Sequence, residues 1–422
     1  MYGSSRRNQT ILDQLIVSAS NFATGVLLVR GLGLTQFGRF TVAYTLILLA
    51  NNVQLSFISS PMISFGALCA TPQDRARYVR GMFGVQLVFG AIVTVVTGIA
   101  AVGILWVKPQ YGSMRLIPAL ACGVLMFLMQ DWLRRYYFTV GKAWASIWND
   151  AISYIGQLIV LLVLAVIHQL SVVSALWAIA LTSGAAFAMG VFFERLGFTA
   201  LEIQLAWRRS RSASRDLAIA SQLQWFVYQG AMLIGANVLG AQAAGSVRAT
   251  QNVVGPVNVG FQAMENLVPI KAGEEMRRGG VQQVAAFLLR FGAKGFLLLS
   301  IVFLGIGAFA KDFLSFFYGH QVAVYSGILD LQLLYFLLVW PLRQFNYLFR
   351  TIGRTGAILW SSLAAAMTSL VLIYPFVHRY NALGIMLAAV SGQIANLVWM
   401  AAAWLRMRPS LHTEPESFSS MR

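Results

Sequence analysis

Basic residues interrupt the apolar C-terminal half of the chain, where they could bind an anion. Arg343 lies in the run Trp-Pro-Leu-Arg-Gln-Phe-Asn-Tyr, and Arg290 and Lys294 lie four residues apart, on one face of a helix. A guanidinium group binds phosphate through paired, charge-assisted hydrogen bonds. A charged side chain inside a membrane is costly and indicates a functional site. Arg290 and Lys294 have a second interpretation, in which they extend to phosphates of the inner leaflet.

A polar stripe occupies the segment 243–272, and its members recur every three or four residues: Arg248, Gln251, Gly255, Asn258, Gln262 and Glu265. Such a stripe does not face lipid, because each unpaired polar group would cost kilocalories, so it faces an aqueous cavity or another helix. Pro256 lies within the stripe and should kink the helix. Pro341, two residues before Arg343, is a second predicted hinge, and Glu265 is a candidate partner for Arg343.

The N-terminal half contributes a second set of polar residues. Gln14, Ser18, Asn21 and Gly25 follow a 4-3-4 spacing, which places them on one helical face. That face either lines a cavity or packs against another helix, since small and polar residues gather in both places. Arg30, at the outer end of this helix, and Asn51, in the middle of the next one, complete the predicted substrate cavity.

The acidic residues have a different interpretation. Asp131 and Asp150 are expected at inner helix ends near Arg134 and Arg135, where surface salt bridges are the favoured role. Asp13 also lies at an inner end, whereas a carboxylate that binds a coupling ion is expected deeper in the membrane. Asp13 is therefore only a secondary candidate for that role.

Enzyme and metal signatures are missing from the sequence. It contains no Walker loop, no H-E-x-x-H and no G-x-S-x-G motif. Its two cysteines and four scattered histidines form neither a disulfide framework nor a metal cluster. We expect no catalytic activity, no metal and no cofactor. A coupling ion, H+ or Na+, is left open.

Long helices in a membrane must position these residues. The chain of 422 residues is 58% hydrophobic and 11% charged, with a mean hydropathy of +0.69, so it needs an apolar solvent. A span of about 30 Å requires roughly 20 apolar residues. Twelve such helices are predicted, at 11–32, 38–69, 79–107, 114–139, 144–168, 171–199, 216–239, 243–272, 281–310, 325–350, 354–378 and 380–407.

The basic residues orient these helices. The net charge of +17 does not indicate nucleic acid, because the basic residues punctuate apolar runs instead of forming one basic face. With the N-terminus in the cytoplasm, 21 basic residues fall on the inner side and 7 on the outer side. This bias predicts an even number of spans with both termini in the cytoplasm.

Four regions are predicted along the chain. Residues 1–199 and 217–407 form two six-helix lobes, 200–216 a basic cytoplasmic linker and 408–422 a cytoplasmic tail. A shift of 207 residues superposes the pairs Gly33/Gly240, Gly38/Gly245 and Asn51/Asn258. Parallel repeats of six helices are a known transporter plan.

A cavity lined by arginines and amides suits an anion that carries hydroxyl groups, which in a bilayer suggests a lipid-linked glycan. Moving an anion out of a negative cytoplasm is downhill by roughly 2.3 kcal/mol per charge per 100 mV. Transport of a pyrophosphate therefore needs no ATP site.

Short motifs carry a resemblance over most of the chain. Residues 13–40, with Asp13-Gln14, Ser20-Asn21-Phe22 and Arg30-Gly31-Leu32-Gly33-Leu34-Thr35-Gln36-Phe37-Gly38-Arg39-Phe40, resemble the N-terminus of the Wzx-type lipid-linked oligosaccharide flippases. These belong to the multidrug/oligosaccharidyl-lipid/polysaccharide exporter superfamily. The C-terminal lobe of that family is similar to the motifs Phe317-Tyr318-Gly319, Pro341-Leu342-Arg343, Gly353-Arg354-Thr355 and Tyr380-Asn381-Ala382-Leu383-Gly384.

The resemblance implies an all-α, MATE-like fold of two lobes that alternate access around a cationic cavity in the bacterial inner membrane. It implies an undecaprenyl-pyrophosphate-linked oligosaccharide as cargo, for O-antigen, capsule or exopolysaccharide assembly. A polysaccharide polymerase and a chain-length regulator are the implied partners beside the lipid bilayer. Arg343, Arg290 and Lys294 would attract the pyrophosphate from the inner leaflet, and Arg248 and Arg30 would meet it near the outer end.

Two alternatives stay open. A cation-coupled MATE-type exporter of small molecules or drugs would want acidic residues deep in the lobes. A polymerase-type component of a polysaccharide assembly system would need a large outer loop. A non-transporting component of such a system would tolerate loss of the cavity arginines.

Overall fold

The computed structural model describes residues 2–67, 69, 71–210 and 215–407. This part of the chain consists of helices joined by short turns and loops and contains no strand. In hydrocarbon a backbone must satisfy its own hydrogen bonds, and a helix does so within one segment. The predicted tail, 408–422, lies outside the described residues.

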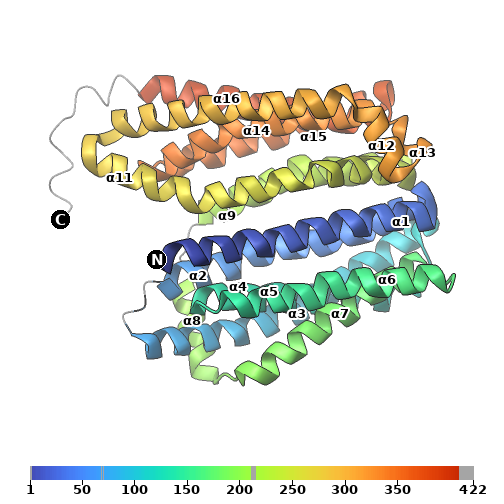
Figure 1. The fold of residues 1–422 in the computed structure, drawn as a ribbon, viewed down its shortest axis with the longest axis horizontal. Helices are drawn as coiled ribbons and strands as arrows, with labels where there is room; N and C mark the ends of the chain where they lie inside the picture. Colours follow the sequence, from blue (N-terminus) through green and yellow to red (C-terminus); the bar gives the residue numbers. More distant parts are fainter. Residues whose placement is uncertain (1, 68, 70, 211–214, 408–422) are drawn as a thin grey trace.

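Two bundles stack side by side (Figure 1). We call residues 2–194 the N-terminal bundle and 215–407 the C-terminal bundle. The first consists of α1 Tyr2–Gln54, η1 Leu55–Ser59, α2 Ser60–Ala67, α3 Pro72–Val107, η2 Pro109–Tyr111, α4 Leu116–Val140, α5 Ala143–Asp150, η3 Ala151–Ile155, α6 Gly156–Val166 and α7 Val172–Glu194. The second consists of α9 Arg215–Trp225, η4 Phe226–Gly230, α10 Ala231–Leu239, α11 Ala241–Ala308, α12 Ala310–Tyr318, α13 His320–Ala323, α14 Ser326–Thr351, α15 Thr355–Tyr380 and α16 Ala382–Met407.

Twelve spans account for these helices. By length and apolar composition, nine stretches of the described residues could cross a membrane. The first, Leu12–Gly66, contains two predicted helices, which meet at Gly33, where φ is 76° and ψ 164°. Two more predicted helices, near 216–239 and 243–272, are helical here although they are not among the nine. Dividing the first stretch and adding those two gives the predicted twelve.

Glycines with positive φ turn the chain at one end of both bundles. Gly33 and Gly240 have φ of 76° and 88°, a region that only glycine enters without strain. We call this end the Gly33 end and the opposite one, where α1 begins and α16 ends, the terminal end (Figure 1). The repeat predicted from the sequence thus places equivalent turns in the two halves.

The predicted linker contains a helix of its own. α8, Ala200–Ser210, packs on α3, where a Cβ on Gly81 would lie 2.2 Å from the carbonyl oxygen of Glu202. Leu201, Leu205 and Trp207 of α8 are exposed. The helix is therefore seated on the N-terminal bundle by small residues, with apolar side chains on its free face.

The two bundles meet along α1 and α11. A Cβ on Gly38 would lie 1.8 Å from the carbonyl oxygen of Ala241, and one on Gly245 would lie 2.5 Å from that of Leu34. Farther from the turns, a Cβ on Gly25 would meet the amide of Asn252 at 2.0 Å. Glycines thus allow the two helices to approach at backbone distance. We call the whole interface between the two bundles, in which α1 also contacts α9 and α12, the seam.

Candidate functional site

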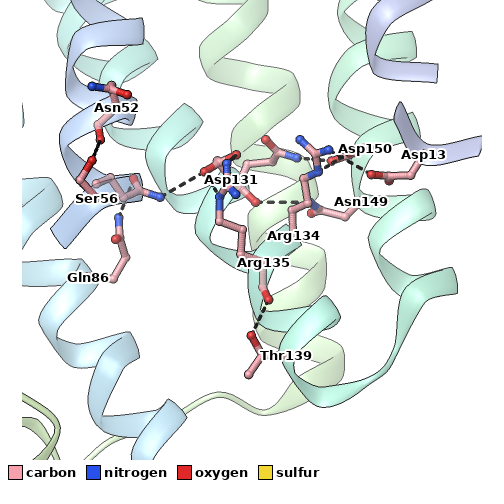
Figure 2. A network of polar contacts seen from close by, with 12 residues as sticks. Asp13, Asn52, Ser56, Gln86, Asp131, Arg134, Arg135, Thr139, Asn149 and Asp150 are labelled. Atoms are coloured by element: carbon pink, nitrogen blue, oxygen red, sulfur yellow. Dashed lines mark hydrogen bonds and ion pairs between the residues drawn. The ribbon is translucent and has the colours of Figure 1, made fainter. Parts of the chain in front are cut away.

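A network of charged and amide side chains is buried in the N-terminal bundle, toward the terminal end (Figure 2). We call it the charged cluster. It joins α1, α3, α4 and α5 and consists of Asp13, Gln54, Gln86, Gln130, Asp131, Arg134, Arg135, Asn149 and Asp150.

Arg134 holds two carboxylates at once. Its Nη2 lies 3.0 Å from Oδ2 of Asp13, and its Nε lies 2.9 Å from Oδ2 of Asp150. Both aspartates are fully buried, and 12% of the arginine side chain is exposed. Gln130 donates to the other oxygen of Asp150 at 2.8 Å, and Ser146 donates to Asp13 at 3.5 Å. One guanidinium group therefore ties α1, α4 and α5 together.

Asp131 forms the second half of the cluster. Arg135 donates two hydrogen bonds to it, Nε to Oδ2 at 2.8 Å and Nη2 to Oδ1 at 3.2 Å. Gln54 donates to Asp131 Oδ2 at 3.4 Å and accepts a hydrogen bond from Gln86 at 3.3 Å. A carboxylate with a bidentate arginine is strongly held, and here amides extend the network to α3.

Local helix geometry orients these residues. Residues 130, 131, 134 and 135 lie on one side of α4 because they are three or four apart. A wide, π-helical turn begins directly after Gln54, at η1, and another directly after Asp150, at η3. Such turns add a residue to the helix and often occur at functional sites. They rotate the following apolar residues relative to the polar side chains.

The charge balance of the cluster is uneven. Three carboxylates face two guanidinium groups, so full ionisation leaves one negative charge in a buried site. The predicted salt bridges of Asp131 and Asp150 form, with Arg135 and Arg134, but their predicted surface position is wrong, since 3% and 0% of the two aspartates are exposed. The sequence places Asp13, Asp131 and Asp150 near helix ends, but it does not show that α1 and α5 pack over α4 and bury the three carboxylates.

The C-terminal bundle buries an uncharged counterpart, which we call the amide cluster. Gln393 donates to Gln224 Oε1 at 3.2 Å and to the hydroxyl of Tyr335 at 2.9 Å. Gln224 donates to Ser362 at 3.2 Å, and Asn396 donates to Gln393 at 3.5 Å. A third π-helical turn, η4, begins two residues after Gln224. Sequence reasoning missed this cluster, although Gln393 interrupts an apolar run.

The polar stripe of the predicted eighth helix lies in the first part of α11, along the seam. Arg248 stacks on Tyr44 of the N-terminal bundle, 5.3 Å from the ring centre, and donates to Gln251 at 3.4 Å. Gly255 faces Ser18 of the N-terminal bundle, whose hydroxyl would lie 4.0 Å from an added Cβ. The side chains of Asn258, Gln262 and Glu265 lie outside the described residues.

Pro256 does not interrupt α11. Within this helix, the backbone departs from helical dihedral angles at Gly279 and Gly280, where the ribbon turns back at the terminal end (Figure 1). Pro341 likewise lies inside the continuous helix α14. The hinge role of both prolines stays a prediction.

The structure does not bring Arg290 and Lys294 of α11 together with Arg343 of α14. The Arg343 guanidinium is 4.7 Å from the ring centre of Phe261 and is half-buried. α11 contacts α14 through Gly292, whose carbonyl oxygen accepts from Trp340 at 2.7 Å. Arg290 and Lys294 are exposed. Each lies two residues from Gly292, so both are on the face of α11 that points away from α14. That placement favours contact with lipid phosphates over a shared site with Arg343.

The remaining predicted residues lie in the N-terminal bundle. Asn21 and Asn51 are half-buried. The neighbour of Asn51, Asn52, crosses the seam and donates to Gln222 at 3.0 Å. Arg30 also crosses the seam, at the Gly33 end, and donates to the carbonyl oxygens of Phe316 and Phe317.

Two cavities open in the N-terminal bundle. One, of about 310 Å³, lies between α4, α5 and α7 and includes Trp148, Asn149 and Phe193. The other, of about 560 Å³, lies at the Gly33 end and includes Gln36, Arg39 and Tyr111. Neither is lined by the residues predicted for the substrate cavity, although Asn149 belongs to the charged cluster.

Comparisons with known proteins identify the fold. No family model matches the chain, and no curated protein matches its sequence. Among solved structures, an inward-facing multidrug resistance MATE family transporter of the MOP superfamily shares 14% identity at a TM-score of 0.78, covering 96% of this chain and 100% of the other.

Two further structures point the same way. A MOP superfamily transporter from Pyrococcus furiosus, described as having a binding pocket of reverse polarity, shares 17% identity at a TM-score of 0.68, over 97% and 95% of the two chains. The lipid II flippase MurJ, in an inward closed conformation, shares 11% at 0.68, over 95% and 87%. The predicted all-α, two-lobed MATE-like fold is confirmed.

Proposed function

We propose that this protein is a membrane transporter that flips an undecaprenyl-pyrophosphate-linked oligosaccharide from the cytoplasmic to the periplasmic leaflet. The lobes would alternate access around the seam, in the bacterial inner membrane, with both termini in the cytoplasm. A polysaccharide polymerase and a chain-length regulator would take over the cargo. The product would serve O-antigen, capsule or exopolysaccharide assembly.

The distribution of charge carries this proposal. Arg30 and Arg248 lie on the seam, where the amides of Asn52, Gln222 and Asn252 accompany them. The three aspartates of the charged cluster are enclosed by arginines inside one bundle. The seam therefore presents cations and amides, which suit a pyrophosphate and sugar hydroxyls. The fold is also that of a structure described as a lipid II flippase.

The first test is deletion of the gene in the native host, followed by extraction of lipid-linked glycans. Complete repeat units should accumulate in the inner leaflet while surface polysaccharide disappears. Complementation with Arg248→Ala, made at normal level, should restore little export, whereas Arg39→Ala, which changes a residue whose side chain bonds within its own bundle, should restore it. Repeat units that reach the outer face unpolymerised would place the function after flipping.

A second candidate is a cation-coupled exporter of small molecules. The surplus carboxylate of the charged cluster favours it, because a buried negative charge attracts a proton or a metal cation, and one similar structure is described as a multidrug transporter. Expression in a drug-sensitive strain distinguishes the two. A rise in drug resistance that is lost in Asp150→Asn would favour the exporter, and unchanged resistance would exclude it for the drugs tested.

A further inference from the structure

At the Gly33 end, side chains of the N-terminal bundle donate hydrogen bonds to main-chain carbonyl groups of the C-terminal bundle. Arg30 Nε donates to the carbonyl oxygen of Phe317 at 2.8 Å, and its Nη2 donates to that of Phe316 at 2.5 Å. Lys108 donates to the carbonyl oxygen of Asn237 at 3.2 Å, and the hydroxyl of Tyr111 donates to that of Ala236. The four donor atoms belong to three side chains of one bundle, and the four acceptors are main-chain carbonyl oxygens of the other.

The acceptors share a position in their helices. Phe316 and Phe317 lie in the last turn of α12, and Ala236 and Asn237 lie in the last turn of α10. The last carbonyl groups of a helix often lack a following N–H group to bond, and the helix dipole makes them attractive to cations. Of the four acceptors, the carbonyl oxygen of Ala236 also accepts from the N–H group of Gly240 at 2.8 Å. Gly319 and Gly240, both with φ of 88°, end these helices and leave the carbonyl groups pointing out of the last turn. Arg30 and Lys108 thus cap helices of the opposite bundle.

Arg30 dominates this contact. It makes two of the four hydrogen bonds, and Phe22, two turns earlier on α1, packs edge-on against Phe317 at 4.9 Å between ring centres. A hydrogen bond from a charged donor is stronger than one from a neutral donor. The state in which the Gly33 end is closed therefore depends strongly on one guanidinium group.

The carbonyl acceptors of Arg30 are weaker than a phosphate. They are neutral, whereas a pyrophosphate oxygen is charged and two of them fit the planar fork of a guanidinium group. Arg30 is exposed, so an anion can approach it. The carbonyl groups that it would release lie beside Phe316, 73% of which is exposed, so water can replace the lost donor at small cost.

We infer that Arg30 is a ligand-operated latch, which rests on the proposed function. It keeps the Gly33 end closed through the carbonyl groups of α12 until the pyrophosphate of the cargo binds the guanidinium group and releases them. A ligand shifts a conformational equilibrium only by its difference in affinity between the two states. Here the difference arises because Arg30 can bind the anion fully only after it has left α12.

The experiment measures the distance between the bundles at the Gly33 end. Spin labels are attached at Ser113→Cys, in an exposed loop, and at Gln321→Cys, on the exposed surface of α13 in the opposite bundle, after Cys69 and Cys122 are replaced by serine. Pulsed dipolar spectroscopy in lipid nanodiscs then gives the ratio of open to closed molecules. The probe is farnesyl pyrophosphate, and farnesol, with the same chain but no charge, is the matched control.

The labelled protein with Arg30 intact should show mainly the short distance between the two spin labels. Farnesyl pyrophosphate should raise the open-to-closed ratio, and farnesol should not. Arg30→Gln should raise that ratio about tenfold without ligand and should abolish the response to the pyrophosphate. Arg39→Gln, at the same end but bonded within its own bundle to Gln36, should behave as the unmodified protein.

Two results would overturn the latch. The first is an Arg30→Gln protein that stays as closed as the unmodified one. The second is a pyrophosphate that stabilises the unmodified protein against heating, and so binds, yet leaves the distance unchanged. Neither result touches the proposed function, whose own test is export in the host. Conversely, a protein that exports nothing but opens with farnesyl pyrophosphate would retain the latch and reject the flippase.

Discussion

The N-terminal bundle buries carboxylates and guanidinium groups where the C-terminal bundle buries amides and hydroxyls. In the charged cluster, Arg134 and Arg135 hold three aspartates. In the amide cluster, Gln393 links Gln224 and Tyr335 without any charge. Both clusters tie several helices together, and π-helical turns lie next to both.

The two clusters should respond differently to the substitution of a single residue. Removing one member of a buried ion pair leaves an uncompensated charge, which costs about 3–5 kcal/mol. Removing one member of a neutral network leaves an unsatisfied polar group, which costs about 1–3 kcal/mol. We therefore expect the N-terminal bundle to be held by a few indispensable contacts, and the C-terminal bundle to tolerate single changes better.

The largest effect is expected from Arg134→Met. It strands the carboxylates of Asp13 and Asp150, so the free energy of unfolding should fall by about 3–5 kcal/mol. Thermal unfolding in detergent, followed by near-UV circular dichroism, measures the change. Arg134→Met combined with Asp13→Asn and Asp150→Asn should recover much of the loss, because no buried charge then remains unpaired. A single variant as stable as the unmodified protein would contradict the role of Arg134.

A smaller effect is expected from Gln393→Leu in the amide cluster. The side chains of Gln224 and Tyr335 each lose a partner, so stability should fall by about 1–3 kcal/mol. The same unfolding measurement, run beside Arg134→Met, tests the comparison directly. If Gln393→Leu proves the more damaging of the two, charge is not what distinguishes the bundles.

Arg248→Met should reduce flipping far more than stability, unlike the substitutions in the two clusters. It removes the cation–π contact with Tyr44, which contributes about 0.5–2 kcal/mol, and it removes a cation from the proposed path. Unfolding should change by no more than that amount, while flipping of a fluorescent lipid-linked oligosaccharide in proteoliposomes should fall severely. Equal losses of stability and flipping would show that Arg248 acts only by packing.

The smallest effect is expected from Arg80→Ala on the surface. Arg80 pairs with Glu202 of α8 at 2.8 Å, but 46% of its side chain is exposed. An exposed pair of this kind contributes less than about 1 kcal/mol. Unfolding and flipping should both stay close to those of the unmodified protein, and a drop as large as that of Gln393→Leu would mean that the contact of α8 with the N-terminal bundle is essential.

Composition and periodicity predicted the helices well but placed several side chains wrongly. Apolar runs of about 20 residues fix the number of spans, because hydrocarbon leaves the backbone no alternative to a helix. The turn glycines Gly33 and Gly240 mark the repeat, since their positive φ is tied to residue type. The helix α8, within the predicted linker, was missed because its basic and polar residues resemble a loop.

The predicted site shows the limit of spacing as evidence. Arg248 and Arg30 were expected in the substrate path, and both cross the seam. Arg290 and Lys294 share a face, as their spacing requires, but it is the face away from α14. Spacing gives the angle between two residues of one helix, and the neighbouring helices decide which angle points inward.

The sequence by itself determined that this protein needs an apolar environment, how many membrane spans it has and where the chain turns between them, because these follow from local composition and backbone chemistry. Only the tertiary structure decided the partners of each charge. Asp13 and Asp150 are 137 residues apart in sequence, yet one guanidinium group holds both, since α1 and α5 pack on the same side of α4. Arg30 likewise finds its acceptors 286 and 287 residues away. Contacts of that range depend on how whole bundles pack, which no local pattern encodes.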